Sequence, residues 1–359
     1  MQQQTLTHLA ELIRCDTQNP PRKINIDHDI FRYLDSVIGA AGGFSVEKID
    51  HGEGRITYLA TRGQPELLFN VHLDTVGAGS GWNRPPLQMT VENNRVYGRG
   101  ACDIKGAAAV LLAIAGQSEA PMALLFSTDE EGANGCCIRK FVESLATDKY
   151  RLVVVAEPTQ CEAVLAHRGY LSVLGEFHGE PGHSSDPRAL HDNAIHKACS
   201  WADAAIEYAS AKSDSGNDLC FNIGTISGGS GSNIIAAESH VHWSARISPG
   251  GDSDAALTAI CNLTEPAGEV KWNARFNGPA LPAYGSDDLV ARTFCEQHNL
   301  VIGRPVDFWT EASLFSSIGQ PVIVLGPGNI RQAHTADEWV ELEQLNLAAE
   351  IYGRLLQKA

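Results

Sequence analysis

Leu67-Leu68-Phe69-Asn70-Val71-His72-Leu73-Asp74 is the stretch from which the fold can be inferred. Its apolar residues predict a short buried strand, and the run becomes polar at its carboxyl end, where a histidine stands two residues before an aspartate. Parallel sheets bind ligands at the carboxyl ends of their strands. Because residues i and i+2 of a strand point to the same side, His72 and Asp74 can project into one cavity. His72 is therefore a candidate metal ligand that Asp74 would orient. A His-x-Asp pair without further ligands is, however, more often two ordinary loop residues.

Size and composition indicate a protein of two domains without a membrane span. The 359 residues exceed the size of a typical single core, and 43% hydrophobic residues with 34 glycines suit an α/β protein. No apolar run reaches the roughly 18 residues that a bilayer requires. Residues 1–8 lack the basic start and apolar core of a signal peptide. The sequence therefore favours neither secretion nor membrane insertion.

The number and spacing of the cysteines indicate the cellular compartment, and the net charge limits the kinds of partner that the protein can bind. Nine cysteines without any Cys-x-x-Cys spacing predict reduced thiols and a cytoplasmic protein. The 43 acidic and 27 basic residues give a net charge of −16, which would repel nucleic-acid phosphates. We therefore expect no nucleic-acid partner.

The first part of the chain alternates between helical and strand patterns. Apolar spacing predicts helices at 5–15, 28–40, 105–117 and 137–146, and strands at 56–60, 67–72, 122–127 and 152–155. Such alternation predicts an α/β domain with a doubly wound, mainly parallel sheet. Three of the strands end in candidate ligands, namely His72, Glu131 and Glu157. Asp103 precedes the third helix, where an ordinary helix cap is the alternative reading.

A different pattern begins near residue 166. Strands at 169–178, 221–227, 240–248 and 270–276, with helices at 188–211 and 253–264, follow the order of a ferredoxin-like α+β sandwich. We therefore expect an inserted dimerisation or lid domain at 166–278, and a catalytic domain made of 1–165 and 279–359. The doubly wound pattern returns with a helix at 288–298, a strand at 321–325 and a helix at 341–357. His334 lies in the last loop.

The candidate residues form a set suited to a metal. Imidazoles with carboxylates suit zinc, and such mixed ligands also admit cobalt or manganese. One carboxylate that bridges two ions would give a pair of metal ions about 3.5–4 Å apart, and a further carboxylate could serve as general base. Sequence alone does not decide which of two adjacent glutamates faces the metal. The set is His72, Asp103, Glu130, Glu131, Glu157 and His334.

Five segments in this chain resemble, in the same order, the motifs of the dizinc amidohydrolases, a family that includes aminoacylases, bacterial glutamate carboxypeptidases, acetylornithine deacetylase and succinyl-diaminopimelate desuccinylase. The resemblance covers nearly the whole chain. The segments are His72-Leu73-Asp74-Thr75-Val76, the stretch from Gly98 to Gly106, Asp129-Glu130-Glu131, Ala156-Glu157-Pro158-Thr159, and Ala333-His334-Thr335-Ala336-Asp337-Glu338.

This resemblance implies two zinc ions per subunit, for which cobalt can substitute. His72 and Glu157 would hold one ion and Glu131 and His334 the other. Asp103 would bridge the two ions, Glu130 would be the catalytic base, and Asp74 would orient His72. The family also has a cis peptide bond after its bridging aspartate, which here is the bond between Asp103 and Ile104.

The inserted domain resembles the same family. Gly182-His183-Ser184-Ser185 is similar to the segment whose histidine reaches into the site of the partner subunit and stabilises the oxyanion, which implies a homodimer. Asn233 and Arg246 stand in segments that resemble those placing an amide and a guanidinium near the substrate, and Arg246 would bind its α-carboxylate. The chain departs from the family at Ser244 and Glu311, where aspartates are common. These departures concern the substrate pocket and not the metal chemistry.

Residues 307–313 and 164–169 resemble the deacetylases of arginine biosynthesis, which act on N-acetylornithine or N-acetylcitrulline. The Phe308-Trp309 pair favours the acetylcitrulline type. We expect a small N-α-acetyl amino acid to be hydrolysed to the free amino acid and acetate. A succinyl-diaminopimelate desuccinylase or a dipeptidase of the same family is the alternative. A non-enzymatic ligand-binding relative would lack the base or a ligand, and a serine hydrolase would need a Gly-x-Ser-x-Gly elbow, which does not surround Ser184 and Ser185.

Overall fold

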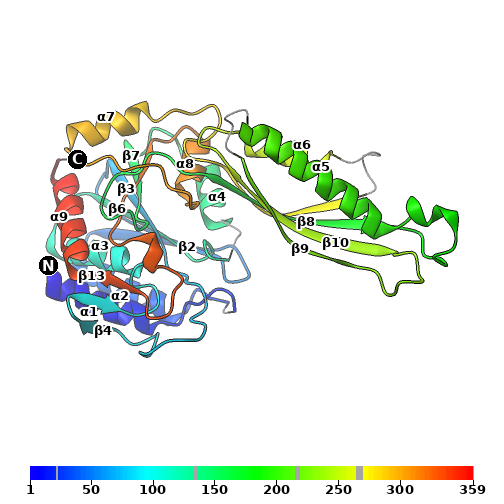
Figure 1. The fold of residues 1–359 in the computed structure, drawn as a ribbon. Helices are drawn as coiled ribbons and strands as arrows, with labels where there is room; N and C mark the ends of the chain where they lie inside the picture. The colour runs from blue at the N-terminus through cyan, green and yellow to red at the C-terminus, as the bar shows by residue number, and fades with distance from the viewer. Residues whose placement is uncertain (22, 133–135, 215–218, 264–269, 359) are drawn as a thin grey trace. The chain divides into compact units, whose positions relative to one another are not determined.

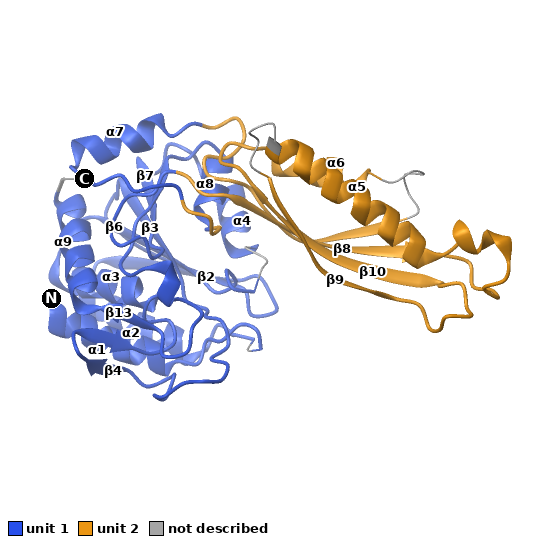
Figure 2. Cartoon of the chain, viewed as in Figure 1, with its two compact units in different colours: residues 1–165, 287–305, 310–359 blue, residues 166–286, 306–309 orange. Residues whose placement is uncertain are grey.

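The computed structural model describes residues 1–21, 23–132, 136–214, 219–263 and 270–358. The chain divides into two compact units (Figure 2). Unit 1 comprises Met1–Leu165, Asp287–Pro305 and Thr310–Ala359, and unit 2 comprises Ala166–Ser286 and Val306–Trp309. Unit 2 thus extends past the predicted boundary at residue 278, because the chain beyond its last strand pairs back to its start: the main chain of His167 bonds to Leu281 and also bridges to Val306.

Unit 1 is built on a mixed six-stranded sheet in the order β1-β2-β6-β3-β7-β12 (Figure 1). β3, β6, β7 and β12 run parallel, whereas β2 pairs antiparallel with β6 and β1 pairs antiparallel with β2. The α/β class expected from the sequence is therefore confirmed. The strands are β1 (Phe44–Asp50), β2 (Ile56–Arg62), β3 (Leu67–His72), β6 (Met122–Ser127), β7 (Leu152–Val155) and β12 (Val322–Val324).

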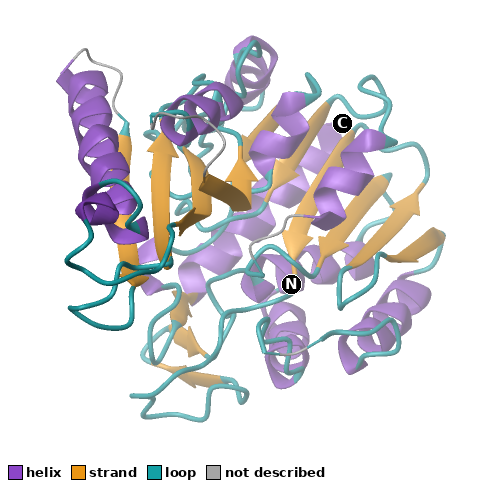
Figure 3. Cartoon of the chain, turned by 90° about the vertical axis from the view of Figure 1, so that its right-hand side faces the viewer, coloured by secondary structure: helices purple, strands orange, loops and turns teal. Residues whose placement is uncertain are grey.

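Helices pack against this sheet (Figures 1 and 3). α3 is buried along almost its whole length because its residues are apolar on all sides, and it packs between β3 and the helices α1, α2 and α9. α4 and α8 pack instead against β2, β7 and β12. The helices of unit 1 are α1 (Gln2–Arg14), α2 (Asp29–Ala41), α3 (Lys105–Gln117), α4 (Cys136–Glu143), α7 (Leu289–Gln297), α8 (Ala312–Ser317) and α9 (Leu342–Lys358).

β3 is buried on both faces, as a central parallel strand requires. Leu67, Phe69 and Val71 belong to the core cluster formed with α1, α2, α3 and α9. Alternation along the strand therefore directs Asn70 and His72 to the opposite face. This face is the one toward which α8 contributes a residue, since Glu311 at the start of that helix bonds to Asn70.

A small second sheet brings two distant segments of unit 1 together. It contains β4 (Thr90–Glu92), β5 (Arg95–Tyr97) and β13 (Trp339–Glu341) in the order β13-β5-β4. Trp339 pairs with Tyr97. The loop that follows β5 therefore lies beside the segment that precedes β13.

Unit 2 is an antiparallel four-stranded sheet with two helices (Figure 2). Its chain order is β8 (Gly169–His178), α5 (Ala194–Asp214), β9 (Cys220–Gly228), β10 (Glu238–Ile247), α6 (Ser253–Cys261) and β11 (Val270–Gly278), and its sheet order is β11-β8-β10-β9. This is the arrangement of a split β-α-β sandwich. α5 begins at Ala194 rather than at residue 188, because a short 3-10 helix, Pro187–Leu190, precedes it and Asn193 bonds to the amides of its first turn. Among the described residues, no helix combines the length and the hydrophobicity of a membrane span.

Trp201 of α5 should be a main determinant of the stability of unit 2. Its side chain is fully buried, its ring packs near Trp243 and Trp272, and its indole nitrogen donates a hydrogen bond to Ile260 of α6 at 3.1 Å. Replacing it with alanine should lower the free energy of unfolding of this unit by about 3–5 kcal/mol. Hydrogen exchange resolved by peptide would measure this loss. Ile206→Ala on the exposed side of the same helix is the control, and an equally small loss for both variants would contradict the expectation.

Candidate metal centre

The ends of the parallel strands carry the predicted metal ligands into one place. His72 ends β3, Glu131 follows β6 and Glu157 follows β7, while Asp103 precedes α3 and His334 precedes β13. Three groups of donor atoms each lie within 4.8 Å of one another. These groups are His72 with Asp103 and Glu157, His72 with Glu130 and Glu131, and Asp103 with Glu131 and His334. All six candidates from the sequence therefore lie together in unit 1.

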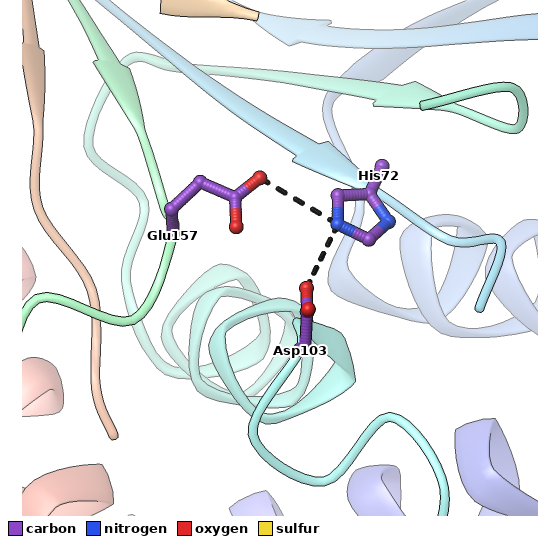
Figure 4. Close-up of side chains that lie close together, drawn as sticks. All are labelled: His72, Asp103 and Glu157. Atoms are coloured by element: carbon purple, nitrogen blue, oxygen red, sulfur yellow. Dashed lines mark hydrogen bonds and ion pairs between the residues drawn. The ribbon is translucent and has the colours of Figure 1, made fainter. Parts of the chain in front are cut away.

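The orientation of the His72 ring is fixed by the main chain. Its Nδ1 donates a hydrogen bond to the carbonyl oxygen of Asp74 at 2.9 Å. Its Nε2 lies 3.0 Å from Oδ1 of Asp103 and 3.5 Å from Oε1 of Glu157 (Figure 4). A neutral imidazole that donates through Nδ1 presents a lone pair at Nε2, and a lone pair that faces two carboxylates requires a proton or a metal cation between them.

Asp103 faces a different histidine with each carboxylate oxygen. Oδ1 lies near His72, and Oδ2 lies 3.2 Å from Nε2 of His334. The same nitrogen of His334 lies 3.0 Å from Oε1 of Glu131. This arrangement fits a carboxylate that bridges two sites. The peptide bond between Asp103 and Ile104 is cis.

A glycine permits the close packing that places Asp103. A side chain at Gly106, in the first turn of α3, would bring its Cβ to 2.4 Å from the carbonyl oxygen of Ala101. Only glycine therefore allows the helix to start directly against the loop that carries Asp103.

Negative charge dominates the electrostatics of the cluster. Burial opposes ionisation, and neighbouring carboxylates add to this effect, so the pKa values of Glu130 and Glu157 lie well above the ordinary range. Burial would lower the pKa of His72, but Glu157 and Asp103 outweigh it and raise that pKa. Hydrogen bonds to Asp103 and Glu131 raise the pKa of His334 to about 10. The carboxylates thus favour positive charge among them.

The donor set fits a divalent metal such as zinc. Two donors bound at about 2.0–2.1 Å to a tetrahedral zinc ion stand about 3.3 Å apart. The nitrogen-to-oxygen distances in the cluster, 3.0 to 3.5 Å, match this spacing. Mixed imidazole and carboxylate ligands also suit cobalt.

Asp74 makes contacts other than those expected. Its main-chain carbonyl, and not its carboxylate, makes the hydrogen bond to His72; the carboxylate oxygen Oδ1 lies 3.6 Å from the ring nitrogen. Oδ2 accepts a hydrogen bond from the amide of Glu131 at 3.0 Å. Asp74 is fully buried, and within the described chain no donor bonds to its Oδ1. Its carboxylate therefore supports the main chain of Glu131, and the predicted role in orienting His72 remains a prediction.

Three consecutive acids after β6 have different surroundings. Asp129 is buried and accepts hydrogen bonds from the amides of Cys136 and Cys137, so it caps α4. Glu131 faces His334, and Glu130 is partly buried beside His72. The geometry thus separates a structural cap from two residues of the cluster.

The remaining predicted site residues belong to unit 2. His183 and Asn233 lie side by side, since His183 bridges to Ile234 and the amide of Ser184 donates to the carbonyl of Asn233 at 3.1 Å. Arg246 lies on β10, where its guanidinium stacks on the ring of Tyr170 at 3.9 Å from the ring centre. His183 and Asn233 are exposed.

Glu311 is a buried carboxyl whose surroundings sequence reasoning missed. It is 1% exposed, and it accepts hydrogen bonds from Nδ2 of Asn70 at 2.7 Å and from Oγ of Ser127 at 3.0 Å. Ser127 pairs in register with His72. The signal in the sequence is the polar Asn70 inside an apolar strand, which calls for a polar partner. Burial is the largest cause that raises the pKa of Glu311 to about 8.

The raised pKa of Glu311 predicts a pH-dependent stability. A folded-state pKa above that of the unfolded chain gives stability that is full below pH 4.5 and is lost as the pH rises toward 8. Metal-free Glu311→Gln should therefore match the wild type near pH 5 and exceed it by about 2–5 kcal/mol above pH 8. Urea denaturation at several pH values measures this difference. The exposed Glu47→Gln is the control, and a difference for Glu311→Gln that does not change with pH would contradict the prediction.

Comparison with known proteins places this site in a family. The profile of the peptidase family M20/M25/M40 matches residues 68–358. The N-acetyl-L-citrulline deacetylase of Xanthomonas campestris pv. campestris is 43% identical, over 98% of this chain and 97% of that protein. The acetylornithine deacetylase of Vibrio vulnificus is 30% identical, over 89% and 88%.

Solved structures share the fold. Aminopeptidase PepT from Bacillus cereus has a TM-score of 0.74 at 18% identity, over 100% of this chain and 98% of that one. The M20 family metallo-carboxypeptidase Sso-CP2 from Sulfolobus solfataricus has a TM-score of 0.72 at 16% identity, over 98% of each chain. With a family profile that matches most of its length and a cluster of candidate metal-binding side chains in unit 1, this chain belongs to the M20/M25/M40 peptidase family.

Proposed function

We propose that this protein is a metal-dependent amidase that hydrolyses N-acetyl-L-citrulline to citrulline and acetate, as a step of arginine biosynthesis. One observation carries the proposal: a cluster of candidate metal ligands lies in a chain 43% identical, over 98% of its length, to an N-acetyl-L-citrulline deacetylase. N-acetylornithine is the next candidate, since acetylornithine deacetylases match the chain at 28% and 30% identity.

Two zinc ions per subunit, replaceable by cobalt, would be held by the cluster. His72 and Glu157 would hold one, Glu131 and His334 the other, and the two oxygens of Asp103 would bridge them. Four carboxylates, counting Glu130, balance the charge of two divalent cations, which supports this number. When bound, the metal would polarise the amide carbonyl and lower the pKa of a water molecule toward neutrality.

Glu130 would move the proton. It would accept a proton from the attacking water as the oxygen bonds to the acetyl carbon, and would deliver that proton to the amide nitrogen as the carbon-nitrogen bond breaks. Its raised pKa, caused by burial and negative neighbours, suits a group that must both take and return a proton.

Residues of unit 2 would bind the substrate. The guanidinium of Arg246 would bind the α-carboxylate, and Asn233 would offer an amide. His183 would act on the oxyanion in the site of a partner subunit, which makes the protein a homodimer and unit 2 its dimerisation or lid domain. Nδ1 of His183 accepts a hydrogen bond from the amide of Ser185 at 3.3 Å, so Nε2 is the atom that would donate. Free cysteines throughout support a cytoplasmic location.

A substrate panel tests the proposed reaction. With zinc or cobalt added, kcat/KM for N-acetyl-L-citrulline should exceed that for N-acetyl-L-ornithine by about 10–200-fold, the range that pocket contacts supply. N-succinyl-diaminopimelate and dipeptides should be poorer still. Faster hydrolysis of either of these two classes would contradict the proposal, and so would an absence of release of acetate from every N-acetyl amino acid.

The role of Glu130 has its own test. Glu130→Ala and Glu130→Gln should lower kcat by about 10²–10⁴-fold, because the proton of the attacking water loses its acceptor. The metal content, measured by mass spectrometry of dialysed protein, should equal that of the wild type, and Asp103→Asn, which should lose metal, is the matched control. Near-normal turnover would refute the assignment as base, and loss of metal would make Glu130 a ligand instead.

A further inference from the structure

Glu338 is a buried carboxylate that joins the two chain segments carrying Asp103 and His334. It stands four residues after His334 and is 1% exposed. Its Oε2 accepts hydrogen bonds from Nη1 of Arg99 at 2.6 Å and from the amide of Gly100 at 3.1 Å. Its Oε1 accepts from the amides of Cys102 at 2.9 Å and of Asp103 at 3.0 Å. The main-chain carbonyl of Glu338 also accepts from the amide of Gly98 at 3.0 Å.

These four hydrogen bonds exclude Glu338 as a metal ligand and as a catalytic base. An ionised carboxylate offers about four lone-pair positions, and the four donors fill two on each oxygen. Glu338 can therefore neither bind a metal nor accept a proton without giving up a buried hydrogen bond. Consistent with this, none of the groups of candidate ligands in the described chain includes it.

Stability alone does not account for the ion pair. Replacing a buried ion pair by packed apolar residues is often neutral or stabilising, so such a pair calls for a role in specifying geometry. Arg99 is 2% exposed and reaches beyond Glu338, donating to the carbonyls of Gly77 and Ala78 at 3.2 and 3.3 Å. The pair therefore gathers the chain after β3, the loop after β5 and the segment before β13 around one point.

The hydrogen bond from the amide of Asp103 to Glu338 shows which part of the geometry the ion pair specifies. It fixes the backbone of the residue whose Oδ1 faces His72 and whose Oδ2 faces His334. The pairing of β13 with β5 begins at the next residue, so Glu338 closes the end of that ladder. A small shift of the backbone at Asp103 would move one oxygen away from its histidine.

We propose that Glu338, supported by Arg99, is a positioning residue that holds the carboxylate of Asp103 between His72 and His334, so that the metal site is formed before metal binds. The inference rests on the metal site of the proposed function. It concerns the preorganisation of that site and adds no ligand to it.

Glu338→Gln tests the inference with little change in shape. The amide nitrogen would turn a donor toward one pair of native donors, either Arg99 and the amide of Gly100 or the amides of Cys102 and Asp103, so the cradle around the side chain would lose two of its four bonds in either orientation. Metal-free protein, prepared with a chelator, would be titrated with zinc and with cobalt in competition with a chromophoric chelator. We expect the variant to bind metal about 10–100-fold more weakly, the usual effect of losing a group that orients a ligand.

Two controls separate positioning from general stability. Tyr352→Phe removes another buried hydrogen bond of unit 1, the one to Leu325 at 2.6 Å, and should leave metal affinity unchanged. Thermal unfolding of the metal-free variants gives the structural cost of each change. If Glu338→Gln binds metal as tightly as the wild type, the inference is overturned, whatever its melting temperature.

If Glu338→Gln does not fold, Arg99→Lys tests the same inference in the same metal titration. Lysine keeps the charge but loses the planar fork that reaches both Glu338 and the carbonyls. It should weaken metal binding less than the glutamine variant, and unchanged affinity would again overturn the inference. Asp103→Asn in the same titration distinguishes the two proposals: if it also leaves affinity unchanged, the metal site of the proposed function fails, and not only its preorganisation.

Discussion

Burying several carboxylates at one edge of a sheet is the constraint on which the structure of unit 1 depends. Such groups are tolerated only when each is bonded or paired. The chain meets this requirement in two ways. Two of the acids, Asp129 and Glu338, accept hydrogen bonds from main-chain amides. The other three face imidazoles, and these are Asp103, Glu131 and Glu157. Among these five acids, bonds from main-chain amides accompany a structural role, and a neighbouring imidazole accompanies a place in the candidate metal cluster.

The parallel strands explain why the acids that face imidazoles lie together at one edge of the sheet. Carboxyl ends of neighbouring parallel strands meet at one edge, and β3 lies between β6 and β7, so the residues at these ends and in the loops just after them are neighbours. Asp103 and His334 do not follow strands of this sheet, so other contacts must bring them to the site. The small sheet of β13, β5 and β4 brings the segments of Asp103 and His334 together, and Glu338 joins them at its end.

Sequence patterns predicted the centre of the fold better than its edges. The central apolar strands and the helix over residues 105–117 could be predicted because burial on both sides leaves a continuous apolar run. β1 was missed because it is an edge strand with mostly exposed side chains, and β13 because three residues show no periodicity. The ligand set was predictable from strand ends and motif order. Which of Asp129, Glu130 and Glu131 caps a helix, and what Glu311 and Glu338 contact, depend on long-range contacts that no local pattern encodes.

Two buried basic side chains, Arg99 and Lys105, flank Asp103 in the chain, and each is bonded elsewhere than to the candidate ligands. Lys105 donates to the carbonyl of Cys15 at 3.0 Å, at the carboxyl end of α1, where the helix dipole favours positive charge. Arg99 is bonded to Glu338. Both flank Asp103 in the chain, but in the described structure neither bonds to its carboxylate, whose oxygens face His72 and His334. An arginine or lysine bonded directly to Asp103 would take the lone pairs that a bridging carboxylate must keep free. The placement of these cations thus leaves the oxygens of Asp103 available to a metal ion.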